Sequence, residues 1–431
     1  MSLDLAGVLG APVDARFKGF PHAASAMPLR DVGRQGWNVL RGDVPFPVAV
    51  VRRSAMRHNS VWMRDFTRAT GVRIAPHGKT TMCPQIFARQ IDDGAWGITV
   101  ADVRQLEVCV SVGVRRAIIA NQVLAPIDIA RLVDLGRRDR ALEVFFLVDS
   151  LEQLALVDAE ARRLEPARPL AALLEIGYEG GRTGVRSSAD ALMLARAIAA
   201  TRTVVLAGIE CYEGLAVTAS DDDAPHVERL LSRVREVAKA CDAEGLFAGP
   251  DVILSAGGSA VFDLVARGLP LELAKPVTTI LRSGCYITHD SGTYERFFER
   301  VRARSGEPWQ SAPGLTAALE VWTLVQSRPE PGLAIITMGR RDVSFDRDLP
   351  RPLKWFRPGV HAAPKPAPSE WQVTALNDQH GYLRLPASAE LRVGDLVGCG
   401  ISHPCTTFDK WQLLMEVDDD YTIVDGLRTF F

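Results

Sequence analysis

The sequence predicts a (β/α)8 barrel joined to a second, mainly antiparallel β domain. From about residue 47 to 262, short apolar or β-branched runs alternate with longer amphipathic stretches, which is typical of buried parallel strands and their crossover helices. After about residue 275 the segments become short, β-rich and punctuated by Gly and Pro, which favours an antiparallel sheet. We therefore expect a barrel over residues 47–275, a β domain over 276–431, and an N-terminal segment, 1–46, that packs on the β domain.

Eight strand candidates in the first region favour a closed barrel over its alternative, a doubly wound open sheet. Amphipathic stretches such as Ser54–Thr70 and Leu151–Leu164 predict the helices between them. The strand candidates are Pro47–Val51, Val72–Pro76, Gly97–Val100, Ala117–Ala120, Val144–Val148, Ala171–Ile176, Val204–Cys211 and Val252–Ser255. In the second region they are Trp371–Ala375, Gly381–Leu385, Leu396–Gly400 and Tyr421–Val424.

The composition indicates a globular protein that acts on a small molecule. A chain of 431 residues with 47% hydrophobic and 24% charged residues is expected to form two domains. Its net charge of −2 gives no bulk attraction to nucleic acid or to an anionic membrane, and no apolar run is long enough to cross one. Seven widely spaced cysteines and the absence of a signal-like N-terminus indicate the reducing cytoplasm.

The residues after the second strand candidate form the turn Pro76-His77-Gly78-Lys79-Thr80. Sites in such barrels form at the carboxyl ends of the strands. A lysine in that setting can attack a carbonyl group and form a Schiff base. The chain has only seven Lys against 43 Arg, so an incidental surface Lys at this position is less expected.

A glycine loop, Gly257-Gly258-Ser259, follows the last strand candidate and precedes a helix expected from about Ala260. Glycines let a backbone approach an anion closely, and the start of a helix favours phosphate. A plain helix-entry turn is the alternative for this loop alone. Together with Lys79, the loop predicts an aldehyde cofactor that carries a phosphate group.

Two further strand ends supply polar side chains. Arg182 and Thr183 follow the sixth strand candidate, and Tyr212 follows the seventh. Arg182 could orient a cofactor ring or a carboxylate, and Tyr212 could stack or donate a hydrogen bond. Gln122, after the fourth strand, is a weaker candidate. Each of them alone could equally be structural.

In the second domain, His403 and Cys405 flank Pro404. In an extended segment their side chains would project to one face. An imidazole nitrogen and a thiolate suit Zn²⁺, and two protein ligands leave positions for water and substrate. A chance H-x-C triplet is the alternative.

These pieces resemble the alanine-racemase-like barrel of fold-type III pyridoxal-phosphate enzymes. The barrel motifs are His77–Thr80, Gly97–Ala101, Ile119–Val123 and Arg182–Val185. Arg282–Tyr286, Asp290 and His403–Cys405 resemble the C-terminal domain of D-serine dehydratases and D-threonine aldolases. The resemblance covers roughly residues 45–415.

The resemblance implies a role for each of these positions. Lys79 is expected to bind pyridoxal 5′-phosphate covalently, and His403 and Cys405 to bind Zn²⁺ or another divalent metal. A small D-amino acid is the expected substrate, and a homodimer the expected assembly. The remaining cofactor and substrate residues are expected to be His77, Gln122, Arg182, Thr183, Tyr212, Gly257, Gly258 and Ser259 for the cofactor, and Tyr286 and Asp290 for the substrate.

Departures from the family pattern favour dehydration over aldol cleavage. Aldolases of the family tend to have Asp where this chain has Cys405, and a His base where it has Leu215. We therefore expect a D-serine dehydratase that forms a 2-oxo acid and ammonia. Cleavage of D-threonine to glycine and acetaldehyde, and a non-catalytic carrier of the cofactor, are the alternatives. Thr81, often His in the family, leaves the choice of β-hydroxy-D-amino acid open.

Overall fold

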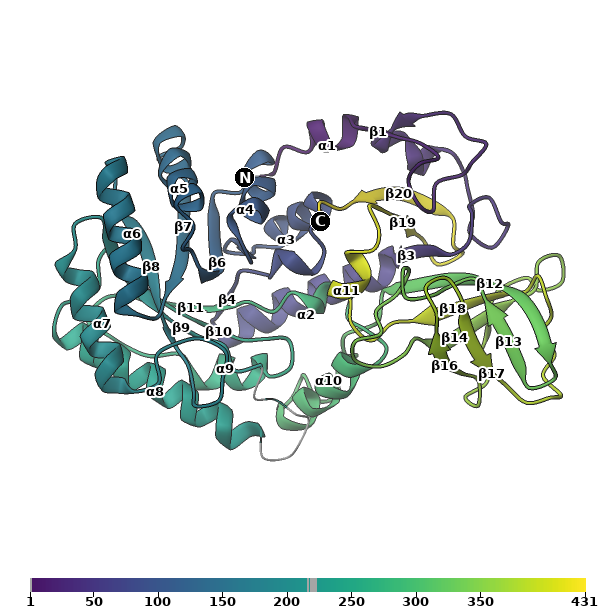
Figure 1. Ribbon diagram of the computed structural model, residues 1–431. Helices are drawn as coiled ribbons and strands as arrows, with labels where there is room; N and C mark the ends of the chain where they lie inside the picture. The colour runs from purple at the N-terminus through teal and green to yellow at the C-terminus, as the bar shows by residue number, and fades with distance from the viewer. Residues whose placement is uncertain (1, 215–216, 218–222) are drawn as a thin grey trace.

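A computed structural model of the chain describes residues 2–214, 217 and 223–431 (Figure 1). Eight parallel strands form one curled sheet in the order β4-β11-β10-β9-β8-β7-β6-β5. Its two edges meet where His77 pairs with Thr99, so the strands enclose a barrel as predicted. The strands are β4 (Arg73–Ile74), β5 (Ile98–Val100), β6 (Arg116–Gln122), β7 (Glu143–Val148), β8 (Leu170–Ile176), β9 (Val204–Cys211), β10 (Val252–Ala256) and β11 (Val277–Leu281).

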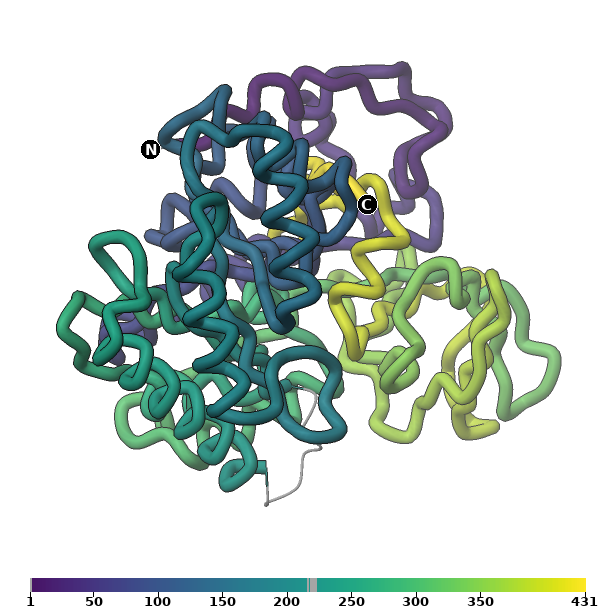
Figure 2. The backbone as a smooth tube through the Cα atoms, turned by 60° about the vertical axis from the view of Figure 1, so that its left-hand side comes forward, coloured from purple at the N-terminus to yellow at the C-terminus, as the bar shows by residue number. Residues whose placement is uncertain are grey.

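Helices surround the barrel and connect its parallel strands (Figures 1 and 2). Parallel neighbours require such crossovers. Asp102, Ser150 and Ser187 each accept a hydrogen bond from a backbone N–H three residues later, which fixes where three of the helices begin. The helices are α2 (Arg53–Thr70), α3 (Pro84–Asp92), α4 (Val103–Ser111), α5 (Pro126–Arg138), α6 (Leu151–Leu164), α7 (Ser188–Ala200), α8 (Asp223–Ala243) and α9 (Phe262–Gly268).

The second domain is built on a mainly antiparallel sheet, also as predicted. Its main path runs β15-β14-β18-β12-β13-β17-β16, and β19, β20 and β3 extend it through β12. Helix α10 (Thr293–Arg304) and the short helix α11 (Cys405–Phe408) lie between the sheet and the barrel (Figure 1). The strands are β12 (Leu319–Glu330), β13 (Leu333–Ile336), β14 (Arg351–Phe356), β15 (Lys365–Pro366), β16 (Gln372–Leu376), β17 (Gly381–Arg384), β18 (Leu396–Gly400), β19 (Leu413–Val417) and β20 (Ile423–Arg428).

One strand prediction is wrong, and one barrel strand escaped prediction. The segment predicted as the first barrel strand is β3 (Val48–Arg52), which lies in the second sheet between β12 and β19. The barrel instead takes β11, which pairs with β10 and β4. Val48–Val51 are all buried, as in a parallel barrel strand, so their pattern does not tell the two sheets apart. The domain limits stay a proposal, and these strands favour moving both limits to just after β3 and β11.

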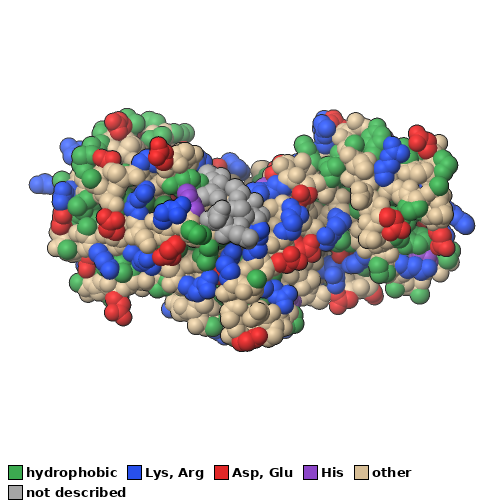
Figure 3. Space-filling view, turned by 90° about the horizontal axis from the view of Figure 1, so that it is seen from below, with side chains coloured by type: hydrophobic (Ala, Val, Ile, Leu, Met, Phe, Trp, Pro, Cys, Tyr) green, Lys and Arg blue, Asp and Glu red, His purple; other side chains and the backbone are tan. Residues whose placement is uncertain are grey.

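The N-terminal segment contacts both parts of the chain: Asn38 pairs with Thr422 beside the second sheet, and the Asp4 N–H donates to the carbonyl oxygen of Val112 after α4. It contains α1 (Ala6–Gly10), β1 (Pro12–Val13), β2 (Met27–Pro28) and the 3₁₀ turn η1 (Leu29–Arg34). Lys18 forms an ion pair with Asp342 at 3.0 Å. Seen from below, the two domains form two lobes with a saddle between them (Figure 3). Within the described residues, every helix is too short or too polar to cross a membrane.

Candidate active site

The lysine turn, the loop after β11 and helix α11 meet where the two domains join. The lysine turn is the 3₁₀ segment η2 (Gly78–Thr80), and the loop after β11 leads into η3 (Cys285–Ile287). A Cβ atom on Gly284 would lie 2.5 Å from both the carbonyl oxygen of His77 and the hydroxyl of Thr80. Only glycine therefore lets these two backbones approach so closely.

Lys79 occupies the middle of η2, with an exposed side chain. Beside it, His77 has its Nδ1 atom buried without a hydrogen-bond partner among the described residues. Burial lowers the pKa of His77 well below its usual range, and the charges of Lys79, Arg282 and Arg182 lower it further. An accessible amine next to a neutral imidazole with an unused nitrogen fits a site for a polar aldehyde cofactor.

The glycine loop after β10 binds an anion within the protein itself. The backbone N–H groups of Gly257 and Gly258 donate to the Glu213 carboxylate, at 3.2 and 2.5 Å. Gly257 has φ +97°, a conformation that favours glycine. Ser259 accepts a hydrogen bond from the Cys285 N–H at 3.3 Å and keeps its own proton to donate. The glycine amides thus bind a carboxylate as they stand, and a phosphate could use them only if it displaced Glu213.

The predicted helix after this loop begins slightly later than expected. Helix α9 starts at Phe262 rather than at about Ala260, and it has 7 residues. The anion-binding character of the loop therefore comes from the glycine amides rather than from the helix.

A buried polar network lies beneath these loops. Glu175 on β8 and Glu210 on β9 are register partners. Gln122 and Thr183 donate to Glu175, the latter at 2.6 Å, and Arg282 donates to Glu210 at 2.5 Å and to the carbonyl oxygen of Cys211 at 2.8 Å. Burial raises the pKa of Glu175, and it raises that of Glu210 to about 7.

Of this network, Glu175, Glu210, Arg282 and Glu213 were not predicted as site residues. The available signal was a glutamate inside each of two apolar strand runs, because a buried carboxylate needs a specific partner. Arg182 and Tyr212 do come together, with the guanidinium 5.4 Å from the ring centre.

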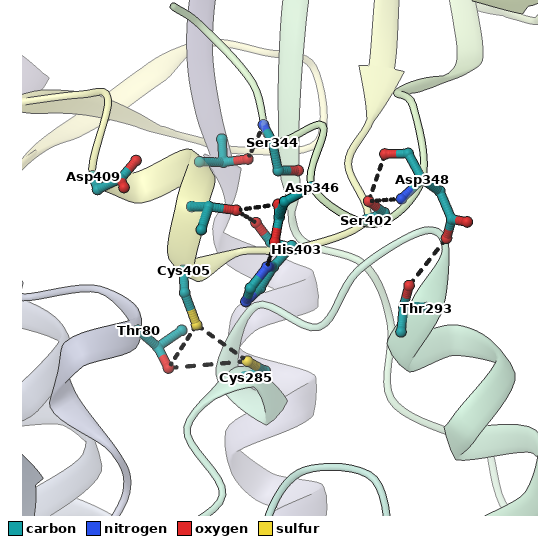
Figure 4. A network of polar contacts seen from close by, with 12 residues as sticks. Thr80, Cys285, Thr293, Ser344, Asp346, Asp348, Ser402, His403, Cys405 and Asp409 are labelled. Carbon is teal, nitrogen blue, oxygen red and sulfur yellow. Dashed lines mark hydrogen bonds and ion pairs between the residues drawn. The ribbon is translucent and has the colours of Figure 1, made fainter. Parts of the chain in front are cut away.

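Two cysteines and a histidine meet between the domains (Figure 4). The Sγ atoms of Cys405 and Cys285 lie 3.6 Å apart, and the Cys405 Sγ lies 3.5 Å from the hydroxyl of Thr80. His403 Nδ1 lies 2.6 Å from Asp346. The contact with Cys285 holds the pKa of the Cys405 thiol well below its usual range, and a hydrogen bond from His403 lowers it further.

These residues offer metal ligands of the expected chemistry. A thiolate and an imidazole whose other nitrogen binds a carboxylate are typical of zinc sites. Among the described residues, no group of three or more His, Cys, Asp or Glu side chains is arranged to hold a metal ion. His403 and Cys405 therefore fit a metal by donor type and position. Tyr294, whose hydroxyl contacts Cys285, is a further polar residue here that was not predicted.

The structure places the two predicted substrate residues differently from the others. Tyr286 is buried in the core, and its hydroxyl accepts a hydrogen bond from Gln90 at 3.4 Å. Asp290 Oδ1 accepts backbone N–H bonds at the start of α10, while Oδ2 is buried without a described partner. Leu215 lies outside the described residues.

Comparison with known proteins finds relatives over most of the chain. Residues 318–417 match the family model described as "Putative serine dehydratase domain". A D-threonine aldolase from Arthrobacter sp is 26% identical over 87% of this chain and 90% of its own length. A D-threo-3-hydroxyaspartate dehydratase from Delftia sp. (strain HT23) is 27% identical over 85% of this chain and 93% of its own.

Solved structures share the fold over most of the chain. D-threonine aldolase from Filomicrobium marinum superposes with a TM-score of 0.73 at 24% identity, covering 90% of this chain and 95% of that one. An alanine racemase-like protein from Idiomarina loihiensis superposes with a TM-score of 0.68 at 16% identity, covering 89% and 96%. The chain thus has the alanine racemase-like barrel fold with a second β domain, as predicted. The similarities also support the predicted resemblance to D-serine dehydratases and D-threonine aldolases.

Proposed function

We propose that the chain is a pyridoxal-phosphate- and zinc-dependent lyase that removes water from a β-hydroxy-D-amino acid such as D-serine, giving a 2-oxo acid and ammonia. One observation carries the proposal. Thr80, the residue after Lys79, has its hydroxyl 3.5 Å from the sulfur of Cys405. The lysine turn and the metal-binding segment are therefore in contact, as is required if they act on neighbouring carbons of one substrate.

The cofactor, when bound, withdraws electrons from the substrate Cα, and a divalent metal makes a hydroxyl a better leaving group. The protein supplies the groups that position and move protons. Lys79 is the base for the Cα proton, since its amine is accessible at the carboxyl end of β4. Ser259 and the glycine loop would hold the phosphate, and His403 with Cys405 would hold the metal.

The buried network sets the charge around the cofactor ring. Arg282 stays cationic beside Glu210, with which it forms a 2.5 Å ion pair. Arg182 lies over Tyr212 at the mouth of the site, where it can orient a carboxylate. Gln122 and Thr183 fix Glu175 below them. These residues orient the reacting groups rather than exchange protons with the substrate.

Dehydration is favoured over aldol cleavage by the identity of two residues. Cleavage requires a base that removes the proton of the β-hydroxyl, and Leu215 has no titratable group. Cys405 provides a thiolate where the aldolases of the family tend to have a carboxylate. The Delftia relative is named for dehydration and the Arthrobacter relative for aldol cleavage, so both reactions occur among similar chains.

The test is an assay of the cofactor-loaded protein with D-serine, L-serine, D-threonine and D-threo-3-hydroxyaspartate, with and without a chelator. We expect a 2-oxo acid and ammonia from the D-isomers, and loss of this activity when the metal is removed. Glycine as the product would favour the aldolase. Cofactor binding without turnover of any substrate would favour a non-catalytic carrier.

A Cys405→Ala variant tests the metal step directly. Formation of a 2-oxo acid at the wild-type rate by metal-free Cys405→Ala protein would contradict a role for zinc. A homodimer and a cytoplasmic location stay predictions, to be checked by light scattering and by fractionation.

A further inference from the structure

We propose that Cys285, at the start of η3, is a third protein ligand of the metal, together with His403 and Cys405. The inference rests on the proposed metal dependence but goes beyond it. It assigns a role to a cysteine that lies 120 residues before Cys405 and outside the H-x-C segment. It also predicts that the metal links the segment that follows the last barrel strand to helix α11, because Cys285 follows β11 and Cys405 begins α11.

The spacing of the two sulfur atoms is the first argument. They lie 3.6 Å apart, and all seven cysteines are free thiols. Two thiolates on one tetrahedral zinc, each about 2.3 Å from the metal, are separated by about 3.8 Å. Two thiols joined by a hydrogen bond have a similar spacing. A metal could therefore bind both sulfur atoms without movement of either backbone.

The backbone fixes the Cys285 thiol in place, which is the second argument. The N–H of Cys285 donates to Ser259, and its carbonyl oxygen accepts from the His289 N–H at 2.7 Å. Gly284 holds this segment against the lysine turn. The side chain is 4% exposed. A ligand held by the protein before the metal arrives loses little conformational freedom on binding.

The orientation of His403 is the third argument. Its Nδ1 contacts Asp346, which also accepts from Thr406 at 2.8 Å. The Nε2 atom is thereby left for a metal, in the carboxylate–histidine–metal pattern. Figure 4 shows the His403 ring between Asp346 and the two sulfur atoms. Since the three side chains do not yet form a finished site, we expect metal binding to draw the imidazole toward the sulfur pair.

A His–Cys–Cys set has a chemical consequence. Three protein ligands leave one tetrahedral position open, as in catalytic rather than structural zinc sites. Two thiolates also favour Zn²⁺ or Cd²⁺ over the harder Mg²⁺ and Mn²⁺. The substrate hydroxyl would then bind at the single remaining position.

Cobalt(II) binding to the full-length, reduced protein tests the assignment without any turnover. Thiolate-to-cobalt charge-transfer absorption reports the thiolates bound to the metal. In Cys285→Ser we expect this absorption to fall by roughly half, because one of two thiolates is lost. We expect the affinity to fall at least about tenfold, the loss that even outer partners of a metal site can cause.

Cys399→Ser is the matched control, since Cys399 is also fully buried but lies on β18. It should keep the full absorption, and circular dichroism with the cofactor's visible band should show that both variants are folded. Unchanged absorption and affinity in Cys285→Ser would overturn the proposal, as would a wild-type protein without a charge-transfer band. Failure of the D-serine assay with the cobalt result intact would count against the proposed reaction alone.

Discussion

The two ends of the barrel differ in their chemistry, although the same eight strands form both. At the amino ends of the strands, a cavity of about 260 Å³ is lined largely by apolar side chains, among them Trp96, Phe145, Ala207 and Ile253. At the carboxyl ends, the strands carry buried charges, such as Glu175 and Glu210.

We therefore expect residues at the amino end to affect mainly stability, and residues at the carboxyl end to affect mainly function. At the amino end, the apolar lining such as Ala207 and Ile253 can be altered as a packing problem, because these side chains have no polar atoms. At the carboxyl end, each change leaves a charge, an amide or a thiol without its partner. Sites in such barrels form at the carboxyl end, and the distribution of charge in this chain follows that rule. Four substitutions would break or sharpen the contrast.

The largest effect is expected for Lys79→Ala at the carboxyl end. Loss of the base should reduce turnover about 10²–10⁴-fold, and the visible absorbance of the bound cofactor should also be lost. Lys275→Ala is the control at the amino end, where the Lys275 ammonium donates to the carbonyl oxygens of Phe247 and Gly249. Product formation and absorbance spectra check both variants. Equal losses in the two would abolish the contrast.

Gly284→Ala should have the next largest effect. The added Cβ would meet His77 and Thr80 at 2.5 Å, so the two loops must separate. A shift of this kind can cost about 10²-fold in rate. Gly136→Ala is the control, because a Cβ there lies 4.0 Å from its nearest neighbour, Arg168, at the opposite cavity. Rates that are equal for both alanine variants would show that the close approach is dispensable.

The pH dependence of stability should report the buried carboxyl of Glu210. Its pKa is raised from 4.5 to about 7 by burial. The folded state therefore binds more protons than the unfolded state between these values, and the unfolding free energy falls as the pH rises through this window. Glu210→Gln should remove a fall of about 2–3 kcal/mol. Urea unfolding at pH 5 and pH 8 measures it, and identical pH slopes for wild type and variant would contradict it.

The smallest effect is expected for Ala207→Val. Ala207 lines the apolar cavity and is 8% exposed. Filling part of that space should raise the unfolding free energy by up to about 1 kcal/mol and leave turnover unchanged. Thermal unfolding and the D-serine assay check the two parts. A loss of activity here would mean that the two ends are coupled.

The fold could be predicted from the sequence where local pattern and tertiary environment agree. Seven of the eight barrel strand candidates are barrel strands, because buried parallel strands have continuous apolar runs. β3 was misplaced because its buried run is equally suited to the middle of the other sheet. β11, the strand that takes its place in the barrel, lies after about residue 275, where the sequence pattern changes to short, β-rich segments.

The candidate site could be predicted only where residues adjoin a strand end or form a short motif. Lys79, the glycine loop and His403 with Cys405 were predicted in that way. Glu213 was missed because its partners, the amides of Gly257 and Gly258, lie on a different loop. Cys285 and Cys405 are 120 residues apart, and no local pattern announces a contact between them.

The place of β3 has a consequence for how the protein is made. This strand is synthesised before the barrel, yet its neighbours β12 and β19 follow the barrel. The barrel strands can all emerge from the ribosome while the apolar face of β3 still lacks a partner. Long-range pairing of this kind is slow and exposes nascent chains to aggregation. Yield of active enzyme should therefore depend on chaperones that shield this early segment until the last strands arrive.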